Sequence, residues 1–170
     1  PIKAIAQVLE GKQTVLSDFF RSPNGAVCID AVTSVSDSMN RPVAIGVMRY
    51  AAKDNIYPLL QFWPIPSGSA ETLLVQKAGD DVLFLNDLRH RSNTALSLRI
   101  PLTRSENPAV RAALGGRGIF DGVDYRGAEV LAYLSPVPDS AWLMVAKVDA
   151  SEILAEVNYL VWICTVFVAL

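Results

Sequence analysis

The stretch that decides the fold is "GVDYRGAEVLAYLSPVPDSAWLMVAKVDASEI", residues 122–153. It contains two strand-like runs rich in apolar and β-branched residues, separated by the turn residues of "SPVPDS". Short turns between such runs favour antiparallel pairing. The second run continues into "DASEI", where Asp149 is placed to cap a helix and Glu152 stands at the capping-box position. We therefore expect an antiparallel hairpin that leads directly into a helix.

The residues upstream predict the strands and helices of an α+β fold with antiparallel sheets. Asn107 and Pro108 open a short helix at 107–116, because Asn caps helices and Pro favours the first helical position. The prolines and glycine of "WPIPSGS", residues 63–69, mark the clearest linker. The expected strands are 26–35, 41–51, 71–77, 81–86 and 94–102; the expected helices are an amphipathic one at 2–20, interrupted by Gly11, and a short one at 54–63 capped by Asp54.

The run 122–153 resembles the closing hairpin and exit helix of Cache domains, which are PAS-like extracytoplasmic sensors of bacterial chemoreceptors, histidine kinases and cyclic-dinucleotide signalling enzymes. The likeness lies in the glycines before a strand, the "SPVP" strand end, the Trp-led last strand and the "VDASEI" that follows it. The stretch 28–50 looks like the same closing hairpin in a membrane-distal unit. The resemblance implies a PAS/Cache-like fold, with flanking helices, that is followed by the start of a transmembrane helix.

The resemblance also implies a division of the chain into two units. Too few residues precede the first hairpin for a complete distal unit, so the distal pocket is expected to be incomplete; alternatively, the chain has one full pocket and a helical and hairpin extension. The expected parts are the end of a distal unit at 1–62, a linker at 63–70, a whole proximal unit at 71–153 and a signalling helix entering the membrane at 154–170.

The run "YLVWICTVFVAL", residues 159–170, is apolar throughout apart from Thr165. A membrane-spanning helix needs roughly 20 apolar residues, so one interpretation is the first half of a span, with Tyr159 and Trp162 at the bilayer surface. The other is a helix or strand buried in the core of an ordinary domain. Together with the resemblance to Cache domains, the first interpretation implies that the protein lies in the bacterial inner membrane, with this segment in the periplasm.

Composition and motifs argue against several classes of function. A net charge of −2 and a pI near 5.4 give no electrostatic footprint for nucleic acid. "GGRGIFDG", residues 115–122, lacks the spacing and the position of a dinucleotide-binding loop. His, Cys and acidic residues lack the spacing of a zinc or calcium site, and no nucleophile elbow is present. We therefore expect no metal, no cofactor and no enzymatic activity in this segment.

Arg89, His90 and Arg91 stand together in "NDLRHRSN", residues 86–93. Two guanidinium groups flanking an imidazole suit a carboxylate, because the planar fork of Arg matches carboxylate geometry. These three residues are therefore candidate ligand contacts. The alternative is a solvated loop in which one Arg pairs with a nearby acid, since exposed charge clusters commonly have no specific partner.

Tyr125 and Arg126 lie in "DGVDYRG", residues 121–127, between two expected strands. In PAS-like folds this region borders the ligand cleft, so the resemblance implies contact between these two residues and a small acid. The alternative is structural: Asp124 would hydrogen-bond the backbone of a turn and pair with Arg126.

These observations favour an extracytoplasmic sensory domain that binds a small organic ligand, such as a carboxylate or an amino acid, and signals to a membrane helix. Homodimerisation through the N-terminal and membrane helices is expected, since two-fold symmetry is the commonest. One alternative is a membrane-anchored interaction module without a small-molecule ligand; another is a soluble enzyme with a buried C-terminal helix. A cleft with converging Arg and Tyr side chains would favour the sensor, and a filled apolar interior would favour the interaction module.

Overall fold

The computed structural model describes residues 2–11 and 14–155, and the chain divides into two compact units, Pro1–Leu59 and Leu60–Leu170. Both units are α+β, and every strand pairing in them is antiparallel. The predicted membrane run at 159–170 lies outside the described residues. Within the described residues, no helix has the length and apolar character needed to cross a bilayer.

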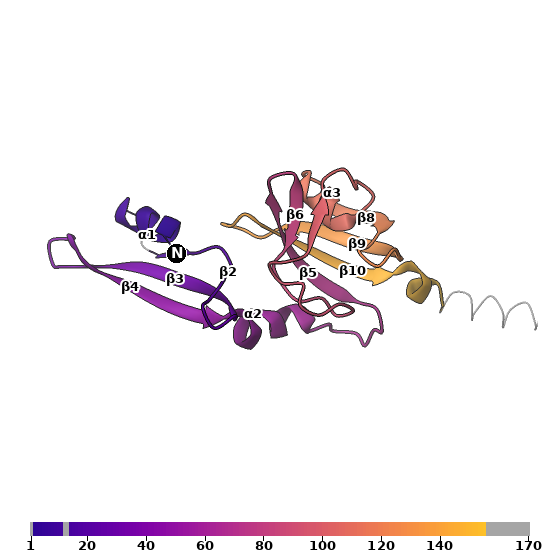
Figure 1. Cartoon of the computed structure of the whole chain (residues 1–170), viewed down its shortest axis with the longest axis horizontal. Helices are drawn as coiled ribbons and strands as arrows, with labels where there is room; N and C mark the ends of the chain where they lie inside the picture. Colours follow the sequence, from indigo (N-terminus) through magenta and orange to yellow (C-terminus); the bar gives the residue numbers. More distant parts are fainter. Residues whose placement is uncertain (1, 12–13, 156–170) are drawn as a thin grey trace, which may run out of the picture. The chain divides into compact units, whose positions relative to one another are not determined.

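The first unit is built on a long hairpin, β3 (Val27–Ser36) and β4 (Pro42–Ala51), as predicted (Figure 1). Helix α1 (Ile2–Leu9) packs Ala4 and Val8 against Val32 of β3. The predicted helix over 2–20 is wrong beyond this point, because the chain turns at Gly11, whose φ is 103°. The segment after it instead forms two short strands that both pair with β3, namely β1 (Thr14–Leu16) and β2 (Phe20–Arg21).

Helix α2 (Ala52–Gln61) follows β4 without a loop. Asp54 was expected to cap this helix, but the helix begins two residues earlier and Asp54 lies inside its first turn. A carboxylate there still favours the helix, because it faces the positive end of the helix dipole.

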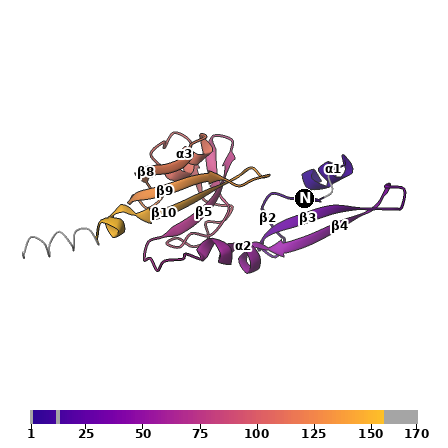
Figure 2. The ribbon, with the colours of Figure 1, turned by 180° about the vertical axis from the view of Figure 1, so that it is seen from behind.

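The second unit contains a six-stranded sheet in the order β7-β6-β5-β10-β9-β8. Figure 2 shows β10 between β5 and β9, so the last strand of the unit is central in its sheet. The predicted strand over 94–102 is shorter in the structure, because Leu96 has a φ of 57° and residues 95–97 turn. The strands are β5 (Glu71–Ala78), β6 (Asp81–Phe84), β7 (Arg99–Pro101), β8 (Gly118–Val123), β9 (Glu129–Pro136) and β10 (Trp142–Asp149).

Helix α3 (Pro108–Ala113) covers one face of this sheet (Figure 1). Asn107 caps it as predicted, since its side-chain oxygen accepts a hydrogen bond from the Ala109 N–H at 3.0 Å. The apolar core lies between this helix and the inner face of the sheet, where Leu73 and Val145 stand opposite each other on β5 and β10. Glu71, two residues before Leu73, and Lys147, two residues after Val145, are also opposite each other and share the same face of the sheet. The inner face therefore changes there from apolar to charged.

Candidate functional site

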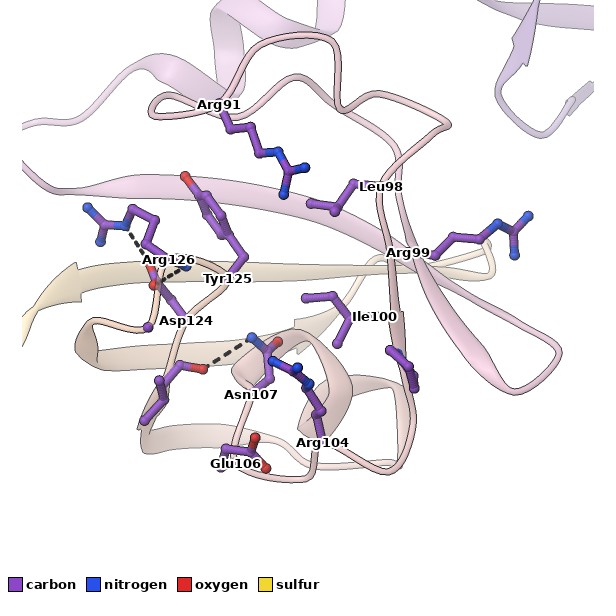
Figure 3. A pocket seen from close by; sticks show the side chains of 13 residues that line it. Arg91, Leu98, Arg99, Ile100, Arg104, Glu106, Asn107, Asp124, Tyr125 and Arg126 are labelled. Carbon is purple, nitrogen blue, oxygen red and sulfur yellow. Dashed lines mark hydrogen bonds and ion pairs between the residues drawn. The ribbon is translucent and has the colours of Figure 1, made fainter.

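A cavity of about 470 Å³ opens beside the charged end of this inner face (Figure 3). It is within the usual size range of small-molecule sites, about 300–1,000 Å³. We call it the arginine cavity, because four of its charged lining residues are arginines and two are acids. The lining residues are Arg91, Leu98, Arg99, Ile100, Pro101, Arg104, Glu106, Asn107, Val123, Asp124, Tyr125, Arg126 and Gly127.

The turn from Asp124 to Gly127 forms one wall of the cavity. The Asp124 Oδ1 accepts the backbone N–H groups of Arg126 and Ala128, at 2.7 and 3.2 Å, and Gly127 closes the turn with a φ of 84°. A φ in this range favours glycine, which has no Cβ. The turn therefore fixes where the side chains of Tyr125 and Arg126 leave the backbone.

A buried ionic cluster supports this wall. Lys147 is 0% exposed, and its Nζ lies 3.0 Å from Glu71 Oε2 and 2.9 Å from Asp124 Oδ2. The Tyr125 hydroxyl donates to Glu71 Oε2 at 2.9 Å. A buried charge is tolerated only when it is paired, and here one ammonium group serves two carboxylates. The cluster therefore fixes the Tyr125 ring at the edge of the cavity.

The electrostatics of the cluster follow from burial and pairing. Burial raises the pKa of Asp124, but hydrogen bonds from Lys147 and Arg126 outweigh it, so the pKa lies below its usual value. Burial, together with the nearby Glu71 carboxylate, raises the pKa of the Tyr125 hydroxyl. Asp124 is thus a carboxylate and Tyr125 a neutral phenol at neutral pH.

Arg126 connects the cavity to the start of the last helix. Its Nε donates to Asp124 Oδ2 at 2.7 Å and its Nη2 donates to Asp149, the final residue of β10. The helix begins at Ala150. Figure 3 shows the Arg126 guanidinium turned away from Leu98 and Ile100 and bonded to Asp124.

The predicted capping box at Asp149 and Glu152 is wrong. The Asp149 N–H donates to Ser69 Oγ at 3.0 Å, and the Glu152 carboxylate accepts hydrogen bonds from the 67–69 segment. Hydrogen bonds from Ser69 and Ser67 lower the pKa of Glu152 to about 2. The physical reason is that four donors of the predicted linker outcompete the single N–H that a capping box offers.

The structure separates the candidate ligand residues from the 86–93 segment. Arg91 lines the arginine cavity together with Tyr125 and Arg126. Arg89 lines a second cavity, of about 400 Å³, and donates from Nη1 to the Ala70 carbonyl at 2.8 Å. His90 is exposed and lines neither of these two cavities. The Leu88–Arg91 bridge closes a tight turn here, so adjacent side chains point in different directions.

Sequence reasoning missed Lys147, Glu71 and Arg104. For the first two, a signal existed in the strand period: Lys147 shares its face with Val145, and Glu71 shares its face with Leu73. A charged residue at a core position of a strand indicates a buried ion pair. Arg104 carries no such signal, because only the fold brings the 101–107 segment beside the 124–127 turn. Among the described residues, no group of His, Cys, Asp and Glu is placed to hold a metal ion.

Comparison with solved structures identifies the fold as Cache-like. The periplasmic sensory domain of the Campylobacter jejuni chemoreceptor Tlp1 matches with a TM-score of 0.55 and 17% identity over 89% of this chain and 56% of its own. The ligand-binding domain of Mlp24, solved with asparagine, matches with a TM-score of 0.54 and 15% identity. The match covers 92% of this chain and 57% of the Mlp24 chain. The extracellular domain of the histidine kinase candidate mmHK1S-Z3 matches with a TM-score of 0.59 and 16% identity. The match covers 87% of this chain and 53% of that domain's chain.

The resemblance to Cache sensor domains is therefore confirmed at the level of the fold. The chain spans a little over half the length of the solved sensor domains that it matches. No family model matches the chain, and no curated protein matches it in sequence.

Proposed function

We propose that this chain is the extracytoplasmic ligand-sensing portion of a bacterial membrane receptor and is not itself an enzyme. Two observations support this. The fold is that of extracellular and periplasmic sensor domains of histidine kinases and chemoreceptors. The second unit also has a cavity lined by Arg91, Tyr125 and Arg126, which supports a sensor over a docking module with a filled interior.

The proposed ligand is a small organic acid or an amino acid. Arg91 is exposed at the cavity and has no ion-pair or hydrogen-bond partner for its guanidinium among the described residues. It is therefore available to a ligand carboxylate, which a guanidinium binds with two parallel hydrogen bonds. The Tyr125 ring forms the neighbouring wall. Mlp24, whose ligand-binding domain was solved with asparagine, has the same fold.

In this proposal the signal leaves through Arg126 and β10. A ligand held by Arg91 lies against the Asp124–Gly127 turn that carries Arg126, so a shift of this turn on binding changes the Arg126–Asp149 pair and favours a different arrangement at the start of the helix from Ala150. The ligand shifts the receptor only by the difference between its affinities for the two arrangements.

The proposed organisation keeps the predicted parts. Residues 71–153 form the membrane-proximal unit, 1–62 are the end of a distal unit, and 63–70 join the two. Residues 154–170 continue as the signalling helix into the inner membrane, with the described part in the periplasm and the receptor a homodimer. The kinase, cyclase or chemotaxis output lies outside this chain.

The interaction module is the second candidate, and β4 favours it. Val43 is 65% exposed, Val47 49% and Met48 61%, so both faces of this strand present large apolar side chains. Apolar side chains exposed together commonly mark a contact with another protein or segment.

A melting experiment separates these two functions. The chain, held in mild detergent, is heated with millimolar organic acids, amino acids and amines. A compound at ~100 times its dissociation constant stabilises the folded state by about 2.7 kcal/mol, which is a shift of roughly 5–10 °C at this chain length. We expect a hit among the acids that disappears in Arg91→Gln and persists in Lys77→Gln, an exposed cation on β5. A panel without any shift contradicts the sensor and favours the interaction module.

A further inference from the structure

The arginine cavity has two guanidinium groups that no carboxylate of the described residues neutralises. Arg126 pairs with Asp124 and Asp149, and Arg99 approaches Asp81 at 3.9 Å. Arg91 and Arg104, in contrast, have no ion-pair or hydrogen-bond partner for their side chains among the described residues. Both line the cavity, so its surplus charge is positive and is carried by these two side chains.

Arg91 and Arg104 stand on opposite sides of the cavity. In Figure 3, Arg91 descends from the loop at the top, while Arg104 rises from the 101–107 segment below. Leu98 and Ile100 lie between them in this view. Ile100 is only 8% exposed and belongs to the apolar core, and Leu98 packs against that core, so these two side chains give an apolar part to the surface between the guanidinium groups.

The acids of the cavity offset only part of this charge. Asp124 is 6% exposed and already pairs with Lys147 and Arg126. Glu106 lies in the lower part of Figure 3 and also lines the cavity, and its carboxylate has no ion-pair partner among the described residues. One unpaired carboxylate thus stands against two unpaired guanidinium groups among the described lining residues, so the cavity keeps a surplus of positive charge that disfavours a cationic ligand.

We propose that the arginine cavity selects a small organic dianion, with two acidic groups joined by a short apolar chain. One acidic group pairs with Arg91 and the other with Arg104, while the chain between them lies on Leu98 and Ile100. This inference rests on the proposed function and names the class of ligand for the same site. Each guanidinium matches one carboxylate in a bidentate way.

The proposal requires a preference for two charges over one. A monoanion of the same length occupies the same apolar surface but forms only one of the two ion pairs. A charge-assisted hydrogen bond contributes enough free energy for about a tenfold gain in affinity. A dianion is therefore expected to bind about tenfold more tightly than its matched monoanion at equal ionic strength.

The test is calorimetric titration of the chain with glutarate and with pentanoate, which have equal carbon chains and differ in one carboxylate. Succinate and adipate vary the distance between the charges, and sulfate measures non-specific binding of a small dianion. Arg91→Gln and Arg104→Gln each remove one guanidinium without breaking an ion pair of the described residues. Lys77→Gln removes an exposed positive charge elsewhere on the same unit and is the control.

We expect one of the diacids to bind about tenfold more tightly than pentanoate, and each Arg variant to lose that advantage. We expect the Arg104→Gln protein to bind the diacid about as weakly as pentanoate, and Lys77→Gln to behave as the unchanged protein. If none of the three diacids binds more tightly than pentanoate, or if an amino acid binds more tightly than all of them, the preference for a dianion is overturned and the sensor function stays intact. The proposal is also overturned if sulfate binds as tightly as the best diacid, because the binding would then be non-specific. If no acid or amino acid binds at all, the proposed sensor function itself fails.

Discussion

Arg126 joins Asp124 and Asp149, two carboxylates that lie 25 residues apart in the chain. Its guanidinium donates to both, so one side chain ties the cavity wall to the residue from which the last helix starts. The side chain is 23% exposed, and its bond to Asp124 is partly buried while its bond to Asp149 is exposed. The bond to Asp124 is therefore expected to contribute more to stability than a surface ion pair does.

Replacing Arg126 with Gln should therefore destabilise the protein. Hydrogen bonds to charged groups contribute about 1.5–3 kcal/mol each, and Asp124 keeps Lys147, so we expect a loss of about 2 kcal/mol. Urea unfolding measures it. Arg104→Gln is the matched control, since its side chain has no bonded partner among the described residues, and should change stability by under about 0.5 kcal/mol. Equal effects of the two substitutions would contradict the role given to Arg126.

Replacing Lys147 with Met should have the largest effect. It leaves Glu71 and Asp124 buried without their shared ammonium, and removing one member of a buried pair costs about 3–5 kcal/mol. The double variant Lys147→Met with Glu71→Leu should recover part of that loss, because it also removes one of the two stranded carboxylates. Urea unfolding of both variants measures the difference; a double variant less stable than the single one would argue against the pairing.

The Glu152 contact predicts a specific dependence on pH. The pKa of Glu152 in the folded protein, about 2, is below its ordinary value of 4.5. Between these two pH values the unfolded chain binds a proton at Glu152 more readily than the folded protein does. The contact therefore stabilises the fold fully above pH 4.5, and this contribution is lost as the pH falls toward 2. Urea unfolding measures the difference in free energy of unfolding between the unchanged protein and the Glu152→Gln variant. This difference should shrink on acidification from pH 6 to 3. A difference that stays constant over this range would refute the contact.

Asn107 should act as a helix cap. Asn107→Ala removes its hydrogen bond to the Ala109 N–H and a second one to the Val123 carbonyl, at 3.1 Å. Loss of a cap of this kind costs about 1 kcal/mol. Thermal or urea unfolding measures it, with Ser105→Ala, an exposed position two residues earlier, as the control. A stability change no larger than that of the control would contradict the cap.

The sequence predicts the hairpins of both units well, because alternating apolar residues and turn chemistry are local signals. The 41–51 and 141–148 strands are examples, and both appear in the structure within a residue or two. The prediction failed where tertiary contacts compete with local ones. Residues 14–16 pair with β3 instead of continuing a helix, and Glu152 turns to the 67–69 segment instead of its own helix end.

The candidate site was predicted in part, for the same reason. Tyr125 and Arg126 could be singled out because the resemblance places the turn between these strands beside the ligand cleft, and both residues line the arginine cavity. Arg89 and Arg91 are two residues apart, and only the geometry of the tight turn places them at different cavities. Arg104 comes to the arginine cavity from a loop whose position depends on α3 and β7, which sequence patterns do not specify.

The central claim is that a ligand in the arginine cavity changes the start of the last helix. Amide hydrogen exchange of residues 149–154 measures this directly, with and without a saturating amount of the acid that gives the largest melting shift. We predict a several-fold change in exchange at Asp149, whose N–H is bonded to Ser69, while the amides of β6 stay unchanged. A ligand that binds with no change in exchange at residues 149–154 would contradict the claim.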